Sequence, residues 1–71
     1  MKTVHSVGDT VKICEEEIYL SDDVEFLLSL KNQELEIVEV DNRNKDMTYY
    51  TCKNQDGIIY GFDFIDADLT R

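Results

Sequence analysis

The stretch that decides the fold is residues 34–64, which read ELEIVEVDNRNKDMTYYTCKNQDGIIYGFDF. In its first part, residues 34–41, charged and aliphatic side chains alternate. Such alternation is typical of a β-strand with one buried face. The phase of the pattern slips between Ile37 and Val38, and a slip of this kind predicts a β-bulge or a sharp bend. We therefore expect a long, bent strand here.

The rest of the stretch predicts antiparallel strands around a tight turn. Residues 41–46 are polar and predict a loop, while residues 47–53 are rich in side chains that favour strands. The Asp-Gly pair within residues 54–57 accepts the positive φ angles that a hairpin turn requires. Residues 58–64 are then expected to form the returning strand. The second half of the chain is thus predicted to be mainly β-structure.

Shorter elements are predicted on both sides of this region. Residues 10–14 alternate with the period of a half-buried strand, and the acidic run at residues 15–17 ends that strand. The run Ser-Asp-Asp at residues 21–23 offers helix N-caps and negative charge for a first turn, so a short helix is expected over residues 22–30. One helical turn and a short last strand are expected at residues 65–68 and 69–71.

Length and composition favour one small folded domain over residues 1–71. The 71 residues leave room for a single domain, and 42% hydrophobic content is well above that of disordered chains. Two cysteines, Cys14 and Cys52, are too few for a disulfide scaffold. The first residues show no apolar leader, and no apolar run is long enough to cross a membrane. We expect a cytoplasmic protein whose thiols are reduced and act as small buried hydrophobic groups.

The charge balance restricts the partners. Sixteen acidic residues against seven basic ones give a formal net charge of -9. Since nucleic-acid binding depends on Lys and Arg neutralising phosphates, direct binding to nucleic acid or to an anionic membrane is disfavoured. The acidity either keeps a small protein in solution or presents carboxylates to a basic partner. The sequence leaves both interpretations open.

No residue pattern indicates a catalytic, metal or cofactor site. His5 is the only histidine, and we expect it to lie solvated in a frayed N-terminal stretch. With two distant cysteines it cannot supply convergent zinc ligands. Asp63, Asp66 and Asp68 could meet a hard cation, but the interpretation adopted is a solvated set of turn-forming and capping acids. We predict that the protein is not an enzyme and holds no cofactor or metal.

The order of segments resembles the small SH3-like barrel proteins of bacteria and bacteriophages. The matching segments are residues 7–11 (VGDTV), 35–40 (LEIVEV), 49–52 (YYTC), 56–57 (DG) and 64–69 (FIDADL). The resemblance covers nearly the whole chain and implies a mainly β fold, a small five-stranded SH3-like barrel with one short helix inserted in the first long loop. Its departure is that first loop, at residues 15–33, which is longer and more helical than usual. Proteins of this group include nucleic-acid-binding and ribosome-binding modules, peptide binders and phage-encoded inhibitors, so the resemblance implies a binding role by analogy.

The aromatic side chains divide into core and surface candidates. Tyr50, Phe62 and Phe64 are expected in the core, because a small barrel fills its interior with large side chains. The resemblance implies a recognition groove between the first loop, the turn before the last strand and the adjoining sheet face. Aromatic side chains beside acidic ones would anchor a partner there. The alternative is that Phe26 and Leu27 simply cap the open end of the barrel. The candidate partner-binding residues are Glu15, Glu16, Glu17, Tyr19, Asp22, Asp23, Phe26, Tyr49 and Tyr60.

Three functions follow as hypotheses. The first is a non-enzymatic acidic protein-binding module, of the kind that phages use to inhibit or modulate a host protein, with a basic protein surface as its partner. The second is a nucleic-acid mimic whose carboxylates occupy the phosphate site of a nucleic-acid-binding protein, and whose binding weakens steeply with salt. The third is an SH3-like nucleic-acid-binding or structural subunit, in which symmetric pairing of chains could create a pocket.

Overall fold

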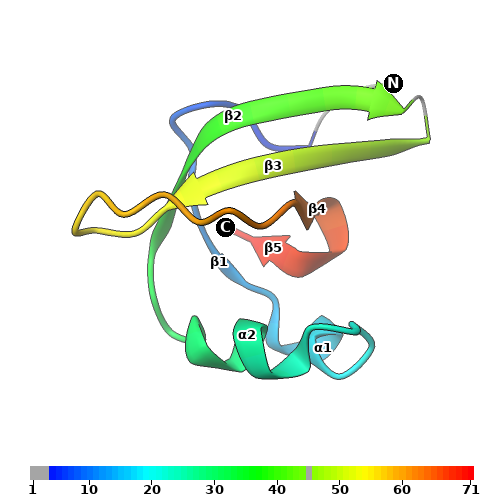
Figure 1. The fold of residues 1–71 in the computed structure, drawn as a ribbon, viewed down its shortest axis with the longest axis vertical. Coiled ribbons are helices and arrows are strands. Elements are labelled where there is room, and N and C mark those ends of the chain that lie inside the picture. The colour runs from blue at the N-terminus through cyan, green and yellow to red at the C-terminus, as the bar shows by residue number, and fades with distance from the viewer. Residues whose placement is uncertain (1–3, 45) are drawn as a thin grey trace.

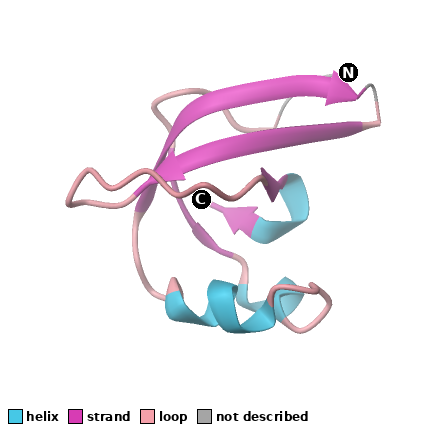
Figure 2. Ribbon diagram, in the orientation of Figure 1, coloured by secondary structure: helices cyan, strands magenta, loops and turns pink. Residues whose placement is uncertain are grey.

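The computed structural model describes residues 4–44 and 46–71 and has five antiparallel strands in one sheet (Figure 1). The strands are β1 (Thr10–Ile13), β2 (Leu35–Asn44), β3 (Met47–Lys53), β4 (Phe64–Ile65) and β5 (Leu69–Thr70), in the spatial order β4-β3-β2-β1-β5. The helices are α1 (Glu15–Ile18), α2 (Val24–Ser29) and the single 3₁₀ turn η1 (Asp66–Asp68). Figure 2 shows α1 and α2 together on one side of the sheet. The predicted mainly β fold is confirmed at this level.

The β2–β3 hairpin carries the predicted bulge. Ile37 is paired with Cys52 and Glu39 with Thr51, so the register shifts at the position where the sequence pattern slips. The predicted loop at residues 41–46 is wrong in its first part, because β2 continues to Asn44. Backbone pairing requires no apolar side chain, and a bond from the Thr48 hydroxyl to the Asn42 side-chain oxygen (2.9 Å) helps to hold the two strands together. Lys45 lies outside the described residues.

The predicted turn at residues 54–57 is confirmed, but the strand after it is shorter than expected. The side-chain oxygen of Asn54 accepts backbone N–H bonds from Asp56 and Ile58, both 2.9 Å long. Gly57 has φ +84°, which an Asp-Gly turn requires. Beyond the turn, a bridge between Lys53 and Ile59 precedes the two-residue strand β4. The intervening residues follow the surface without a continuous ladder.

The sheet is strongly curled, because its two outermost strands are close neighbours in the sequence. Strands β4 and β5 stand at opposite ends of the strand order, yet only the three residues of η1 separate them. In a flat sheet four strand spacings would place them about 19 Å apart. The step from Ile65 to Leu69 can span about 14 Å at most. Within the described residues β4 does not pair with β5, so the sheet is curled but not closed.

The single predicted helix is found as α2, and a second helix, α1, was not predicted. The four-residue α1 contains the three glutamates that we expected only to end the first strand. Its last residue, Ile18, is buried (1% exposed), and this tertiary burial holds a helix too short to be stable by itself. The predicted helical turn and the last strand are confirmed as η1 and β5. Within the described residues no helix is long and apolar enough to cross a membrane.

The core lies between the curled sheet and the helices. Tyr50 and Phe64 are fully buried, as predicted, while Phe62 is partly buried against them. Cys52 is also fully buried. The prediction for His5 is wrong: its side chain is 3% exposed, because it packs edge-on against the Tyr50 ring with 5.4 Å between ring centroids. A ring contact absent from the local sequence pattern thus holds residue 5 inside the molecule.

Candidate functional site

An acidic hollow separates the turn between α1 and α2 from the segment that contains β4 and η1. Its volume is about 360 Å³. Figure 1 shows these two segments facing each other at one end of the molecule, with the helices below and η1 above. The residues that line it, called the acidic hollow below, are Glu17, Leu20, Ser21, Asp22, Asp23, Asp63, Ile65, Ala67 and Asp68. Five of these nine residues are carboxylic acids, so acidic side chains of the chain gather around the hollow.

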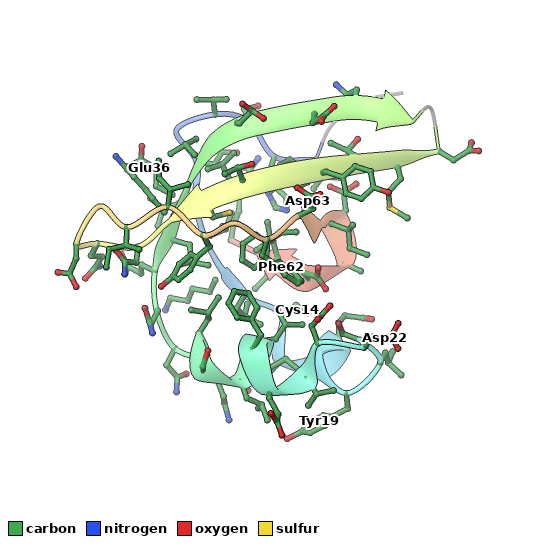
Figure 3. The ribbon with its side chains drawn as sticks, in the orientation of Figure 1. Cys14, Tyr19, Asp22, Glu36, Phe62 and Asp63 are labelled. Atoms are coloured by element: carbon green, nitrogen blue, oxygen red, sulfur yellow. The ribbon has the colours of Figure 1, made fainter. Side chains whose placement is uncertain are left out.

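Local hydrogen bonds shape the lower wall. The Ser21 backbone N–H bonds to the carbonyl of Ile18 (3.2 Å), and the Ser21 hydroxyl oxygen accepts the N–H of Asp23 (3.1 Å). This turn leaves Asp22 and Asp23 exposed at the rim. Figure 3 shows Asp22 on the turn that connects the two helices. Ser21 or Asp22 was predicted to cap the helix, but the N-cap of α2 is Asp23, without a side-chain cap bond. All three residues instead form part of the wall of the hollow.

Asp68 forms the buried part of the upper wall. It is only 7% exposed, and its Oδ2 accepts the backbone N–H of Ile65 (3.1 Å), which caps η1. Burial raises the pKa of the Asp68 carboxyl, and repulsion from Asp23 and Glu17 raises it further, against the opposing effect of the Ile65 bond. The repulsion shows that the charges of the two walls act on each other across the hollow. The predicted capping role is confirmed, but Asp68 is not solvated.

Apolar side chains lie beside these carboxylates. Leu20, in the lower wall, is 79% exposed, and the neighbouring Tyr19 is 73% exposed. Figure 3 shows Tyr19 pointing away from the sheet on the outer side of the helices, so it flanks the hollow without lining it. Ile65 and Ala67 supply apolar surface on the other wall. Large exposed apolar side chains next to a charged concavity are typical of interaction surfaces.

Phe26 belongs to a neighbouring aromatic cluster made with Tyr60, Phe62 and Phe64. Its ring centroid lies 4.7 Å from that of Phe62 and 5.9 Å from that of Tyr60. Phe26 is partly buried, and its remaining surface borders a second hollow shared with Asp22 and Asp23. It therefore packs the helix against the core and also reaches the edge of the acidic region.

The other candidate residues are more dispersed. Glu15 is exposed and forms a surface ion pair with Lys31 (3.8 Å), and Glu16 is also exposed. Tyr49 is paired with Ile65 across β3 and β4, close to the acidic hollow but outside its lining. Of the nine candidates, Glu17, Asp22 and Asp23 are brought together in the hollow. Tyr60 and Phe26 meet in the aromatic cluster.

Sequence reasoning did not assign six of the nine lining residues to the site: Leu20, Ser21, Asp63, Ile65, Ala67 and Asp68. The spacing of Asp63, Asp66 and Asp68 was a usable signal for a turn. It gave no indication that the turn between α1 and α2 faces it. The two walls are at least forty residues apart in the sequence, since Asp23 and Asp63 are their nearest members. Only the curl of the sheet brings them together.

The charge of the hollow distinguishes it from another concavity of about 220 Å³, which includes Lys53 as well as Glu34 and Glu36. Of these, Lys53 and Glu36 form an ion pair (3.9 Å). Among the residues that the structure describes, those that line the acidic hollow include five carboxylic acids and no Lys or Arg. Among the described residues no group of three or more His, Cys, Asp and Glu side chains is arranged to hold a metal ion. The lining is suited to attract a cationic side chain.

Comparison with protein-family models, with curated proteins and with solved structures finds no match to this chain.

Proposed function

We propose that this protein is a non-enzymatic binding module whose acidic hollow takes a basic segment of a partner protein. The observation that carries the proposal is the hollow itself: a concavity of about 360 Å³ with five carboxylic acids and exposed Leu20 in its walls. A Lys or Arg side chain matches both features, because its aliphatic stem packs on apolar surface while its charge meets carboxylates. The predicted anchor Tyr19 extends this surface on the outer side of the turn.

Electrostatics supports a basic partner. A net charge of -9 attracts cationic surfaces from a distance and accelerates encounter. Burial raises the pKa of Asp68, and repulsion from Asp23 and Glu17 raises it further; a cation in the hollow would oppose both effects and favour the charged carboxylate. Binding should therefore tighten as the pH rises above the ordinary range of carboxyl groups.

The SH3-like barrel remains part of this proposal. The strand order, the curl of the sheet and the single 3₁₀ turn before the last strand are consistent with that resemblance. In such a barrel the acidic hollow would lie between the first loop and the turn before the last strand. This is the region in which the resemblance implies a recognition groove.

The test is a titration of the ¹⁵N-labelled protein with a short peptide of alternating Arg and Leu, followed by NMR. We expect chemical-shift changes centred on residues 20–23 and 63–68. The double variant D22N/D23N should bind about tenfold more weakly, since each exposed charge contributes on the order of 1 kcal/mol or less. The matched control E34Q/D56N removes the same charge from residues outside the lining and should bind nearly as the unmodified chain does.

Equal weakening in both double variants would show that only net charge matters, and would contradict a specific site. The same peptide with Glu in place of Arg should not bind. The alternative function is tested with a domain that binds duplex DNA as the probe. If the protein binds this domain in competition with DNA, and if moderate salt abolishes the binding, the nucleic-acid mimic is favoured.

A further inference from the structure

The buried Tyr50 hydroxyl joins two segments that are distant in the sequence. Tyr50 lies on β3 and is 0% exposed. Its hydroxyl oxygen accepts the backbone N–H of His5 (3.3 Å), and its O–H donates to a carboxylate oxygen of Asp66. Burial raises the pKa of Tyr50, and the bond to Asp66 raises it further, so the hydroxyl keeps its proton and remains a donor at neutral pH. Tyr50 therefore ties Asp66 to the β2–β3 hairpin.

The residue that Tyr50 holds begins the upper wall of the acidic hollow. Asp66 is the first residue of η1, and the next two residues, Ala67 and Asp68, line the hollow. The Asp68 side chain turns back within the same segment and accepts the N–H of Ile65 (3.1 Å). The hydroxyl of Tyr50 thus bonds to the short turn that carries the wall, one residue before the lining begins.

A backbone bond connects this wall to the opposite one. The Cys14 N–H donates to the Asp68 carbonyl (2.8 Å), and Cys14 directly precedes α1, which carries Glu17 of the lower wall. Segment η1 is thus attached to the helical layer at its end and to the hairpin at its start. Because like charges on the two walls favour their separation, the attachment to Tyr50 fixes where the upper wall stands.

We propose that the Tyr50 hydroxyl is a positioning group of the acidic hollow: by holding Asp66 it keeps Ala67 and Asp68 facing the turn between α1 and α2. The proposal rests on the proposed function, because it gives Tyr50 a part in binding the basic segment. Tyr50 is fully buried and outside the lining, so it acts through η1 and does not touch that segment. Without the hydroxyl the wall is less ordered, and binding must then offset the entropy of ordering it.

The first measurement is amide hydrogen exchange of the protein alone. The Leu69 N–H bonds to the Asp66 carbonyl and closes η1, so its protection reports on the turn. The Ile37 N–H bonds to the Asp9 carbonyl (3.0 Å) and reports on the sheet. In Tyr50→Phe the protection of Leu69 relative to that of Ile37 should fall by about five- to tenfold, as expected for the loss of one hydrogen bond.

The second measurement is the affinity for the peptide of alternating Arg and Leu. Tyr50→Phe should bind it about five- to tenfold more weakly, although the charge of the chain is unchanged. Tyr60→Phe is the matched control, since it removes a tyrosine hydroxyl whose oxygen accepts a bond from Asn54 (3.2 Å), away from η1. It should change the affinity and the exchange ratio by less than about twofold.

A pair of variants at Asp66 tests the same bond from its other side. Asp66→Asn keeps an acceptor oxygen for the Tyr50 hydroxyl and should keep the exchange ratio within about twofold, whereas Asp66→Ala should lower it as Tyr50→Phe does. This pair decides the question if Tyr50→Phe does not fold.

Three results would overturn the proposal: an unchanged exchange ratio in Tyr50→Phe, an equal loss in Tyr60→Phe, or a lower ratio with unchanged affinity for the peptide. The last of these would show that the hydroxyl has a structural role only. If the unmodified chain does not bind the peptide, the proposed function fails, while the exchange ratio still decides whether Tyr50 positions η1.

Discussion

The helices cover the sheet in two different ways at their two ends. Below the aromatic cluster, the Phe26 ring lies 4.7 Å from Phe62, and α2 packs directly on the core. Below η1, the turn between the helices is separated from the sheet by the acidic hollow of about 360 Å³. The two regions are adjacent in sequence, since Asp23 and Phe26 are one helical turn apart. Apolar rings draw one end of the helical layer onto the sheet, while like charges on facing walls oppose closure at the other end.

The largest difference should appear in thiol chemistry, because Cys52 is buried in the core and Cys14 is only half-buried at the start of α1. Cys52 belongs to the core beside the aromatic cluster, and burial raises the pKa of its thiol to about 12. At about pH 8 its thiolate fraction is then about a thousandfold below that of an ordinary cysteine, so iodoacetamide should label the native chain at half-buried Cys14 and spare Cys52. Mass spectrometry of the native and urea-unfolded protein measures this. Equal labelling of both thiols in the native chain would mean that water and reagent reach Cys52, and that the core beside the aromatic cluster is not closed to solvent.

The second prediction concerns stability at the aromatic end. Replacing Phe26 with Ala removes a ring from between α2 and the cluster, and should lower the free energy of unfolding by about 2–4 kcal/mol. Urea unfolding followed by circular dichroism gives the value. Tyr19→Ala is the matched control, since that side chain is 73% exposed and its loss should change stability by about 0.5 kcal/mol or less. Similar losses in the two variants would remove the distinction between a packed end and an open end.

The third prediction concerns the acidic end. Asp68 keeps its proton to higher pH in the folded chain than in the unfolded chain, because burial and the charges of Asp23 and Glu17 raise its pKa. Its ionisation therefore lowers stability as the pH rises above the ordinary Asp range. Asp68→Asn keeps an acceptor for the Ile65 N–H and removes the charge, so it should be more stable than the unmodified chain by about 1 kcal/mol near neutral pH. The gain should disappear at about pH 3, where Asp68 is protonated and therefore as neutral as the Asn that replaces it. A gain in stability that does not depend on pH would show that it does not come from the charge of Asp68.

The smallest effect is expected at the ion pair outside both regions. Glu15 and Lys31 are both exposed and lie 3.8 Å apart. Such pairs contribute little in water, so Glu15→Gln should change the free energy of unfolding by less than about 0.5 kcal/mol. Urea unfolding at low and moderate salt measures it. A larger loss of stability would show that this exposed ion pair helps to hold α1 in position.

Local patterns predicted the parts of the fold that local physics determines. The bulge follows from a phase slip between Ile37 and Val38, and the turn follows from the freedom of Gly57 to adopt positive φ. Helix α1 could not be predicted in this way, because three glutamates followed by Ile18 have no intrinsic reason to form so short a helix. The burial of Ile18 under the rest of the chain supplies that reason.

The candidate site was predictable only on one wall. Glu17, Asp22 and Asp23 were recognised as an acidic surface, and the structure places all three in the hollow. Asp68 was recognised as a cap, but its burial depends on segments far away in the sequence. His5 was misjudged for the same reason, since its burial depends on Tyr50, forty-five residues later. Long-range pairing, which no short pattern contains, decides both.

The brevity of the outermost strands has a consequence for assembly. Strands β4 and β5 are each two residues long, and η1 bends the chain away between them. A foreign strand that docked on either border could form only one or two ladder bonds before it met the bend, too few to offset the entropy of ordering it. These two borders are therefore poor templates for fibril growth. The long β2–β3 hairpin can form without the sheet continuing into a second molecule at β4 or β5.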